Sequence, residues 1–261
     1  MTRYAPLLLL LAACCSSAVA AQDAAREAMV AEAVTAAIKR EAEQGNSIAQ
    51  NVLAEMYDRG EGVAENDAEA VKWYRLAADQ GIASAQYNLG WMYAKGEGVS
   101  KNEAEAAKWF RLAAERGDAS AQYNLGWMYD NGEGLAENDA EAVKWYRLAA
   151  DRGNASAQFN LGVMYANGAG VAENDAEAVK WFRRAASQGD ATAQWALGLM
   201  YGSGQGVPES KVDAYFWWNL AAAQGNAKAK EMKSVVEPLM TREQIAEAQR
   251  RSAAWKPTVK Q

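Results

Sequence analysis

Apolar residues along this chain recur at the spacing of an α-helix. One segment carries Ala70, Trp73 and Ala77, and the next carries Ala85 and Leu89, so each segment places its apolar residues on a single face. A single helix cannot remove such a face from water without a neighbour. The pattern therefore predicts amphipathic helices that pack against one another in succession.

The same pattern repeats every 36 residues, with no insertion between copies. The sequence Ala-x-Ala-Gln begins at Ala83 and returns at Ala119, Ala155 and Ala191. A tryptophan recurs with the same period, at Trp73, Trp109, Trp145, Trp181 and Trp217. Each indole should bury roughly 150–250 Å², so we expect this row to be the main wedge between helices. Repeats of this length predict an all-α solenoid of helix-turn-helix units, in which neighbouring units stabilise each other.

Each unit predicts two helices, which we name helix A and helix B. Helix A begins after a polar residue that can cap its free N–H groups: Asn46, Asp118, Asn154, Asp190 and Asn226. The second repeat has Ile82 at this position, so we expect a weaker start there. Helix A ends at a Gly-x-Gly loop such as the one at Gly132 and Gly134, because glycine tolerates positive φ.

Helix B begins with the spacing of a capping box, in which Asn replaces the usual Ser or Thr. The pairs are Asn66/Glu69, Asn102/Glu105, Asn138/Glu141 and Asn174/Glu177. A glycine just beyond the last turn predicts the end of helix B. These glycines are Gly81, Gly117, Gly153, Gly189 and Gly225.

The five repeats occupy residues 46–225, and the flanking segments predict caps for the two ends of the stack. Residues 21–45 predict an N-terminal capping helix. Residues 226–255 predict C-terminal capping helices, which break at Pro238 and resume at a capping box that starts with Thr241. Residues 256–261 are short and basic, and we expect them to be disordered.

Residues 1–20 have the layout of a secretory signal peptide, with one early cation, an apolar run and then small residues. Two processing routes remain open. Ala18-Val19-Ala20 is an A-x-A cleavage site, which would release a chain that begins at Ala21. Alternatively, the sequence from Leu11 to Cys14 resembles a bacterial lipobox, and Cys14 would then carry a lipid. Both routes predict an exported protein, periplasmic or at the cell surface, and the second an outer-membrane lipoprotein. No later segment is apolar enough to predict a transmembrane span.

Composition argues against catalysis and against nucleic acid. Histidine is absent, and both cysteines lie within residues 1–20, so the usual bases, nucleophiles and metal ligands are missing. The net charge is −6 and no basic stripe occurs, so the chain lacks the means to neutralise phosphates. Glutamates recur once per repeat, as caps do and a single active site does not. We therefore expect no enzyme activity, no cofactor, no metal site and no nucleic-acid partner.

The repeat resembles that of the Sel1-like family, relatives of the tetratricopeptide repeats with a longer loop between helices. The matching motifs are A-x-A-Q-x-x-L-G-x-M-Y-x-x-G-x-G-V and E-A-x-K-W-(Y/F)-R-x-A-A-x-x-G, from about Gly45 to Gly225. The resemblance implies a right-handed superhelix that acts as an adaptor or scaffold, in many bacterial members in the periplasm or at the cell surface. A cysteine-rich branch is described as penicillin-binding, but this chain lacks those cysteines and that role does not transfer.

Helix A carries the candidate binding face. At about 100° per residue, Leu89 and Tyr93 lie with Ala85 on the core side, and an aromatic and amide row lies away from them. In tetratricopeptide-like solenoids helix A lines the concave groove, where rings and amides would suit an extended peptide. The alternative is that these rings are core between successive helices A. The candidates are Tyr87, Asn88, Trp91, Tyr123, Asn124, Trp127, Phe159, Asn160 and Trp195.

The sequence thus predicts an exported adaptor or scaffold that binds a protein segment on its concave face. Two alternatives stay open. One is an envelope protein that acts on cell-wall metabolism by binding peptidoglycan or a lytic enzyme. The other is a lipoprotein scaffold of an export or polysaccharide assembly, which would require lipid on Cys14.

Overall fold

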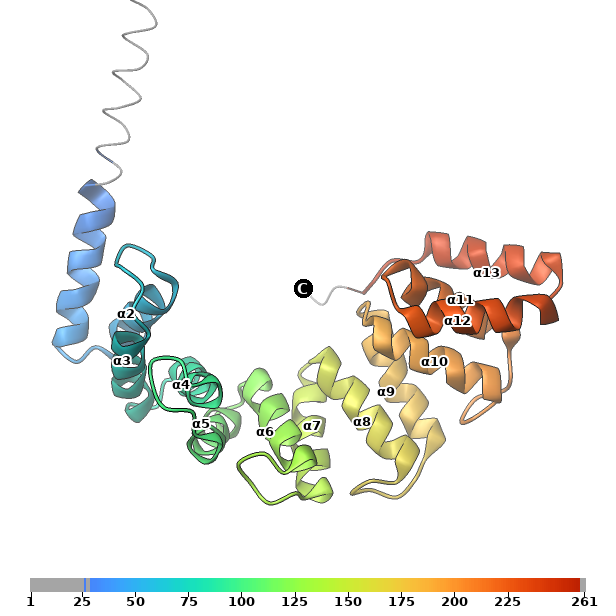
Figure 1. Ribbon diagram of the computed structural model, residues 1–261, viewed down its shortest axis with the longest axis horizontal. Helices are drawn as coiled ribbons and strands as arrows, with labels where there is room; N and C mark the ends of the chain where they lie inside the picture. The colour runs from blue at the N-terminus through green and yellow to red at the C-terminus, as the bar shows by residue number, and fades with distance from the viewer. Residues whose placement is uncertain (1–25, 27–28, 259–261) are drawn as a thin grey trace, which may run out of the picture. The chain divides into compact units, whose positions relative to one another are not determined.

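The computed structural model describes Arg26 and residues 29–258 (Figure 1). The chain divides into two compact units, the first ending at Lys101 and the second beginning at Asn102. An N-terminal helix (29–43) precedes the repeats. The first unit then has α2 (Ser47–Arg59), α3 (Asp67–Asp79) and α4 (Ala83–Lys95). The second unit has α5 (Glu103–Glu115), α6 (Ala119–Asn131), α7 (Asp139–Asp151), α8 (Ala155–Asn167), α9 (Asp175–Ser187), α10 (Ala191–Ser203), α11 (Lys211–Ala223), α12 (Ala227–Val236), the 3₁₀ turn η1 (Glu237–Leu239) and α13 (Arg242–Ala254).

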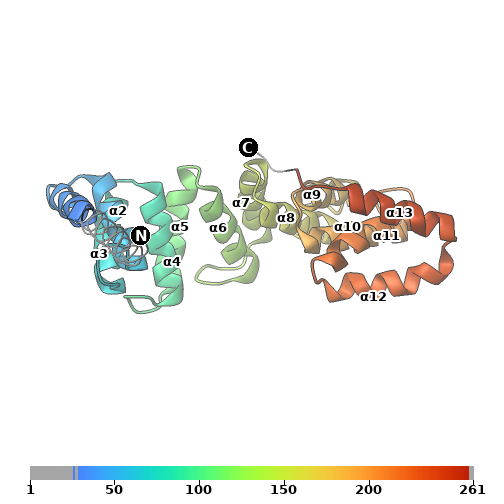
Figure 2. The ribbon, with the colours of Figure 1, turned by 90° about the horizontal axis from the view of Figure 1, so that it is seen from above.

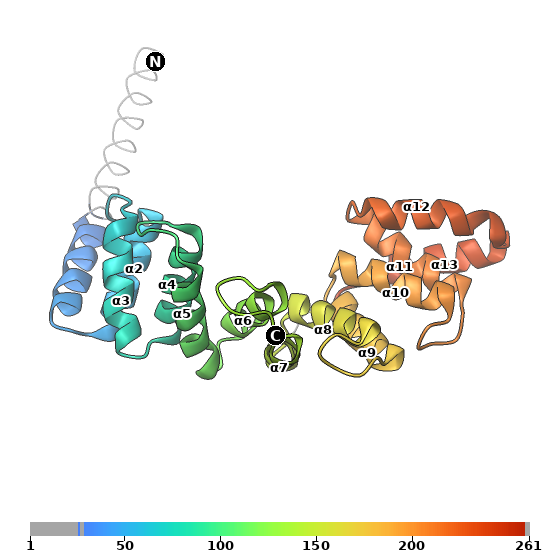
Figure 3. The same ribbon diagram turned by 60° about the horizontal axis from the view of Figure 1, so that its bottom comes forward.

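The prediction of an all-α fold built from helix pairs is confirmed: the described residues contain helices and no strand. Even-numbered helices from α2 to α10 are helices A, and odd-numbered helices from α3 to α11 are helices B. Within each unit, helix A packs most extensively on the helix B that follows it, and helix B packs on the next helix A. Figure 3 shows α2, α3 and α4 side by side in the first unit.

The predicted caps of helix A are present. The side chain of Asp118 accepts a hydrogen bond from the Ala121 N–H at 2.7 Å, and Asn46, Asn154, Asp190 and Asn226 act in the same way. Ile82 provides no side-chain cap to α4, as expected.

Only half of the predicted capping box forms at helix B. The Asn66 side chain accepts from the Glu69 N–H at 3.1 Å, but the Asn66 N–H donates to the Tyr57 carbonyl at 2.8 Å. The Glu69 carboxylate therefore does not turn back to the cap, and it pairs with Lys72 at 3.2 Å. The prediction of a reciprocal box is wrong because a carbonyl of helix A reaches the Asn N–H and closes the loop.

The Gly-x-Gly loops bring successive repeats together. Gly168 and Gly170 both have positive φ, +67° and +64°. A Cβ at Gly170 would lie 2.3 Å from the Asp139 carbonyl carbon, in the first turn of the preceding helix B. Glycine is therefore required at the second position for two reasons, its positive φ and the close approach of the neighbouring repeat.

Within a repeat, a glycine of helix A faces a ring of helix B. A Cβ at Gly126 would lie 2.7 Å from the Tyr146 ring, and one at Gly162 would lie 2.7 Å from the Phe182 ring. Tyr146 and Phe182 are 0% and 3% exposed. These rings follow the repeated tryptophan by one residue, so the deepest aromatic contact in each pair is made by a residue that the sequence pattern did not single out.

The repeated tryptophans lie mainly between repeats. Trp181 belongs to the apolar cluster of α7 and α8, and Trp217 packs against the cluster of α9 and α10. Trp145 and Trp181 are each 8% exposed, whereas Trp73 is only half-buried. Trp181 and Trp217 thus form contacts between successive repeats, and the expectation that the tryptophan row is the main wedge is only partly right.

The glutamine of Ala-x-Ala-Gln is buried and links three segments. The Gln158 Nε2 group donates to the Ala150 carbonyl at 2.9 Å, and its Oε1 atom accepts from Gln188 in the next turn between repeats at 2.8 Å. Gln194 bonds in the same way to Ala186 and Gln224. Gln50 likewise accepts from Gln80 at 2.7 Å, whereas the Oε1 atoms of Gln86 and Gln122 are buried without a hydrogen-bond partner in the part of the chain that the structure describes. The amide therefore joins successive repeats in three of its five copies.

The C-terminal helices cover the last repeat. Both α12 and α13 pack on α11, and Figure 2 shows them on opposite sides of it. Thr241 and Gln244 form a complete capping box at the start of α13. The Thr258 N–H donates to the Ser187 carbonyl at 2.7 Å, so the tail lies against the end of α9 as far as Thr258, although the sequence predicts disorder from Lys256.

The N-terminal helix (29–43) contacts α2 as a helix B contacts the next helix A. The Ala42 carbonyl accepts from Gln50 at 3.1 Å, and Lys39 lies 5.9 Å from the Tyr57 ring centroid. The predicted signal peptide and the possible lipidation site at Cys14 lie outside the described residues.

Candidate partner-binding face

The glutamates that recur in every repeat are used within helix B. The Glu141 backbone N–H donates to the Asn138 side chain at 3.1 Å, and the Glu141 carboxylate pairs with Lys144 at 3.0 Å. Exposed pairs of this kind contribute little to stability. Among the described residues, no three His, Cys, Asp or Glu side chains come together in a group that could hold a metal ion.

The nine predicted binding residues lie on four helices A: α4, α6, α8 and α10. The structure exposes two of their rings, Trp91 at 42% and Trp127 at 36%. These two tryptophans occupy the same position in successive repeats. Tyr87 on α4 is half-buried.

The remaining candidate rings lie at the edge of the core. Tyr123 contacts Tyr146 with the ring centroids 5.9 Å apart, and Phe159 contacts Phe182 at 5.7 Å. Trp195 is half-buried and packs against the clusters of both α9 and α11. Of the nine candidates, the rings of Trp91 and Trp127 are therefore the most accessible to a partner.

The candidate asparagines lie beside tyrosine hydroxyls. Burial raises the pKa of the Tyr146 phenol, the charge of Asp130 raises it further, and a side-chain hydrogen bond with Asn160 opposes the shift. Asn160 also forms a hydrogen bond with the Tyr123 hydroxyl. Burial is the largest effect on the pKa of this phenol and raises it, whereas the bond with Asn160 lowers it. Asn88 stands in the same relation to Tyr74, and Asn124 is half-buried. The Asn160 amide thus joins α8 to α6 and α7, and the Asn88 amide joins α4 to α3.

The sequence reasoning missed a partly buried contact between a tyrosine and a carboxylate. The Tyr146 hydroxyl donates to Asp130 at 3.1 Å, and the Tyr74 hydroxyl donates to Asp58 at 3.3 Å. Both aspartates directly follow the Met-Tyr pair of helix A. Burial raises the pKa of the Asp130 carboxyl, although the hydrogen bond from Tyr146 lowers it.

The helix A residue that follows Met-Tyr varies in size and polarity with the helix B ring opposite it. Where helix B carries Phe182, helix A has the apolar Ala166 packed against the same cluster. Where helix B carries the larger Trp218, helix A has Gly202, at which a Cβ would lie 3.1 Å from the indole. This covariation between repeats was the available signal in the sequence.

Cations of the chain lie over two of the candidate indoles. Lys95 lies 5.0 Å from the Trp91 ring centroid, and Lys228 lies 5.1 Å from that of Trp195. Within residues 29–258 no cation lies over Trp127, and the position equivalent to Lys95 is Asn131. The Asn131 amide donates to the Trp127 carbonyl at 2.9 Å.

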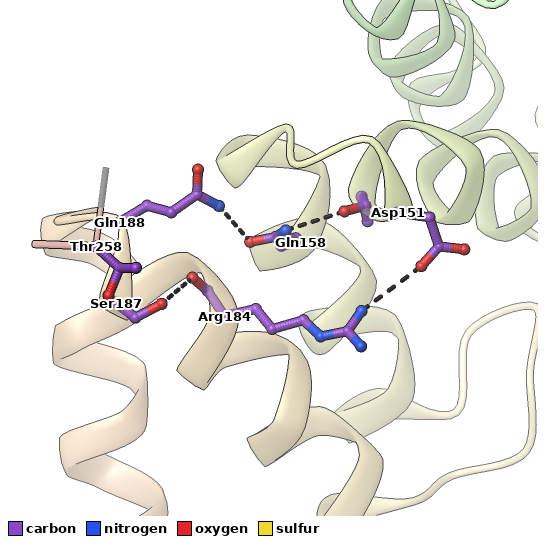
Figure 4. Close-up of a pocket in the computed structure, with 7 residues that line it drawn as sticks. Asp151, Gln158, Arg184, Ser187, Gln188 and Thr258 are labelled. Atoms are coloured by element: carbon purple, nitrogen blue, oxygen red, sulfur yellow. Dashed lines mark hydrogen bonds and ion pairs between the residues drawn. The ribbon is translucent and has the colours of Figure 1, made fainter. Parts of the chain in front are cut away.

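A polar pocket of about 330 Å³ opens where α7, α8 and α9 meet the tail (Figure 4). Its groups are bonded to each other: Arg184 to Asp151 at 3.5 Å, and Gln188 to Gln158 at 2.8 Å. Because these side chains already satisfy one another, the pocket offers few unpaired polar groups to a ligand.

No helix in the described part of the chain is both long and apolar enough to cross a bilayer. The chain has no significant match among curated proteins. Solved structures do match. The structure of c5321, a protective antigen present in uropathogenic Escherichia coli strains and displaying an SLR fold, has a TM-score of 0.76 and 39% identity. The match covers 83% of this chain and 47% of c5321, so this chain spans about half the length of that protein.

A Sel1 repeat protein from Oxalobacter formigenes matches with a TM-score of 0.69 and 36% identity, over 84% of this chain and 88% of that one. The model of the Sel1 repeat family matches residues 47–82, 83–118, 119–154, 155–190 and 191–226. These ranges coincide with the helix pairs α2/α3 to α10/α11 and the turns that follow them. The chain belongs to the Sel1 repeat family, whose members generally act as scaffolds for protein–protein interaction.

Proposed function

We propose that this protein is an exported adaptor that binds a segment of a partner polypeptide along its helix A faces. The observation that carries the proposal is the exposure of Trp127, 36%, on a helix whose other large apolar residues are covered. An indole is costly to leave in water, and exposed aromatic rings mark contact surfaces. Trp91 has the same position in the preceding repeat and is 42% exposed.

An apolar cavity beside α10 also supports the helix A face as the binding site. Leu199 is the residue of α10 that corresponds to Trp127, and it lines a cavity of about 380 Å³ together with Trp218, Val236 and Leu239. A cavity of this size accepts a large apolar side chain of a bound segment. The helix A face therefore combines an open ring with an apolar depression in the second unit.

The test is the double substitution Trp91→Ala/Trp127→Ala. Removing an interface aromatic can weaken binding about thirtyfold per ring, since each can contribute about 2 kcal/mol. The partner is first identified by crosslinking in intact cells and pull-down. Its affinity for the variant is then measured by titration calorimetry, and the melting temperature by circular dichroism. We expect a large loss of affinity and a fall of only a few degrees in melting temperature.

Leu148→Ala is the matched control. Leu148 is 37% exposed, almost as Trp127 is, but it lies on helix B. The control should leave the affinity unchanged. An equal loss in both variants, or unfolding of the double variant, would show that the two rings are not the binding surface.

The proposal of export rests on the sequence of residues 1–20. We also propose that residues 21–45 and 226–255 cap the two ends of the repeats. Edman sequencing of the mature protein separates the two routes. A chain that begins at Ala21 is a soluble exported protein, and one that begins at a lipid-modified Cys14 is an anchored one.

A further inference from the structure

The chain places its own cations over two of the candidate indoles. Lys95, one turn after Trp91, lies 5.0 Å from the ring centroid, within the range of a cation–π contact. Lys228 of α12 lies 5.1 Å from the Trp195 centroid. Two of the three candidate tryptophans therefore already hold an ammonium group of the same protein.

Trp127 differs from these two in its neighbours. Its repeat has Asn131 where the preceding repeat has Lys95, and this amide is held by the Trp127 carbonyl at 2.9 Å. The residue before it is Asp130, where the preceding repeat has Ala94. Compared with the preceding repeat, the repeat of Trp127 therefore lacks the lysine and has an additional carboxylate close to its tryptophan.

Asp130 supplies negative charge at this ring. It lies three residues after Trp127, so the two side chains are neighbours on the surface of α6. One carboxylate oxygen accepts from the Tyr146 hydroxyl at 3.1 Å, which holds the group in place. In the described part of the chain Asp130 forms no ion pair, and burial raises its pKa, as an unpaired, partly desolvated acid requires.

The surrounding charges leave this acid without a cation. α6 contains no lysine or arginine, and Asp139 at the start of α7 adds further negative charge near Asp130. The arginine that reaches α6 from α5 is Arg111, which donates to the Tyr129 hydroxyl at 2.6 Å and lies over that ring. An indole beside an unneutralised carboxylate is therefore complementary to a positive charge.

We propose that Trp127 and Asp130 bind a lysine or arginine side chain of the partner polypeptide. The cation lies over the Trp127 ring, as Lys95 lies over Trp91, and the Asp130 carboxylate neutralises it. This proposal rests on the proposed function, since it names the chemistry that the helix A face of α6 selects. The occupant is a basic peptide segment, because its backbone can follow the helix face while its side chain reaches the ring.

The test begins with a displayed library of random twelve-residue peptides selected on the purified protein. Selected peptides are synthesised, each with a second version in which its lysine or arginine is replaced by glutamine. We expect the selected peptides to share a basic residue, and its replacement to weaken binding roughly 3- to 30-fold. Free lysine methyl ester and choline are titrated separately, and binding as tight as that of the peptides would overturn a peptide as the occupant.

Asn131→Lys is the decisive variant, because it restores the arrangement of the preceding repeat and places the chain's own lysine over Trp127. It should weaken the basic peptides to the level of their glutamine versions. Asp130→Asn should do the same while it keeps an acceptor for the Tyr146 hydroxyl. The control is Asn167→Lys, at the same position of α8, where Val163 replaces the tryptophan; it should leave binding unchanged. Melting temperatures verify that all variants fold.

The outcomes separate this proposal from the proposed function. If Trp127→Ala abolishes peptide binding but Asn131→Lys and Asp130→Asn do not change the preference for a basic residue, the cation site is rejected and the helix A face stands. If no peptide is selected, or if binding is indifferent to Trp127→Ala and Trp91→Ala, both are rejected.

Discussion

Replacing Gly170 with alanine tests how closely successive repeats approach one another. Gly170 has φ +64°, and a Cβ there would lie 2.3 Å from the carbonyl carbon of Asp139 in the preceding helix B. Gly168, two residues earlier in the same loop, has φ +67°, but its nearest neighbour is the Glu173 Cβ at 3.3 Å. The two glycines thus share a backbone conformation and differ in the space around them.

The magnitude follows from these two terms. An alanine in the left-handed region costs about 1–2 kcal/mol, which both variants should lose. At Gly170 the atoms in the way are backbone atoms, which cannot rotate aside as a side chain does, so overpacking adds about 1–3 kcal/mol. For a chain of this size about 1 kcal/mol corresponds to about 2–4 °C. We expect the melting temperature to fall by about 2–8 °C in Gly168→Ala and by about 4–20 °C in Gly170→Ala.

Far-UV circular dichroism during thermal and urea unfolding measures both variants. The comparison is sound only if the folded spectra match that of the parent, since both changes lie in a loop. Equal losses in the two variants would refute the reasoning, because the shared φ would then explain the whole effect and the close contact between repeats would not exist.

Three further predictions concern the tryptophan row, the Asp130 carboxyl and the processing of residues 1–20. Trp145→Ala should destabilise the protein by about 3–5 kcal/mol in urea unfolding, and more than Trp217→Ala, because Trp145 is only 8% exposed and lies inside the stack; equal, small losses would exclude an inter-repeat role. Burial raises the pKa of the Asp130 carboxyl, so the folded protein holds this proton more tightly than the unfolded chain, and the contribution of Asp130 to stability falls as pH rises through the raised pKa. Asp130→Asn should therefore gain urea stability over the parent at neutral pH and lose this advantage below the ordinary pKa of 3.8; a difference independent of pH would contradict this assignment. Cys14→Ser should leave export and the N-terminus at Ala21 unchanged if cleavage follows Ala20, and a change in membrane association would instead support lipidation.

The candidate site was only partly predictable. The helical wheel of helix A places Trp91, Trp127, Tyr123 and Phe159 on one side. It could not distinguish Trp127, at 36% exposure, from Tyr123, which contacts Tyr146. That difference depends on the distance to the neighbouring helix, which an angle around one helix does not contain.

The local features of the fold were determined by the sequence alone. The 36-residue unit, the caps at Asp118 and Asn154, and the positive φ at Gly168 involve backbone groups only a few residues apart, so the residue type suffices to predict them. Tertiary structure decided the contacts between segments. It turned Glu69 from its cap to Lys72, buried Tyr146 more deeply than Trp145, and brought Asp130 to Tyr146. These contacts join residues on different helices, and their partners are set by how closely the helices pack, which local residue preferences do not specify.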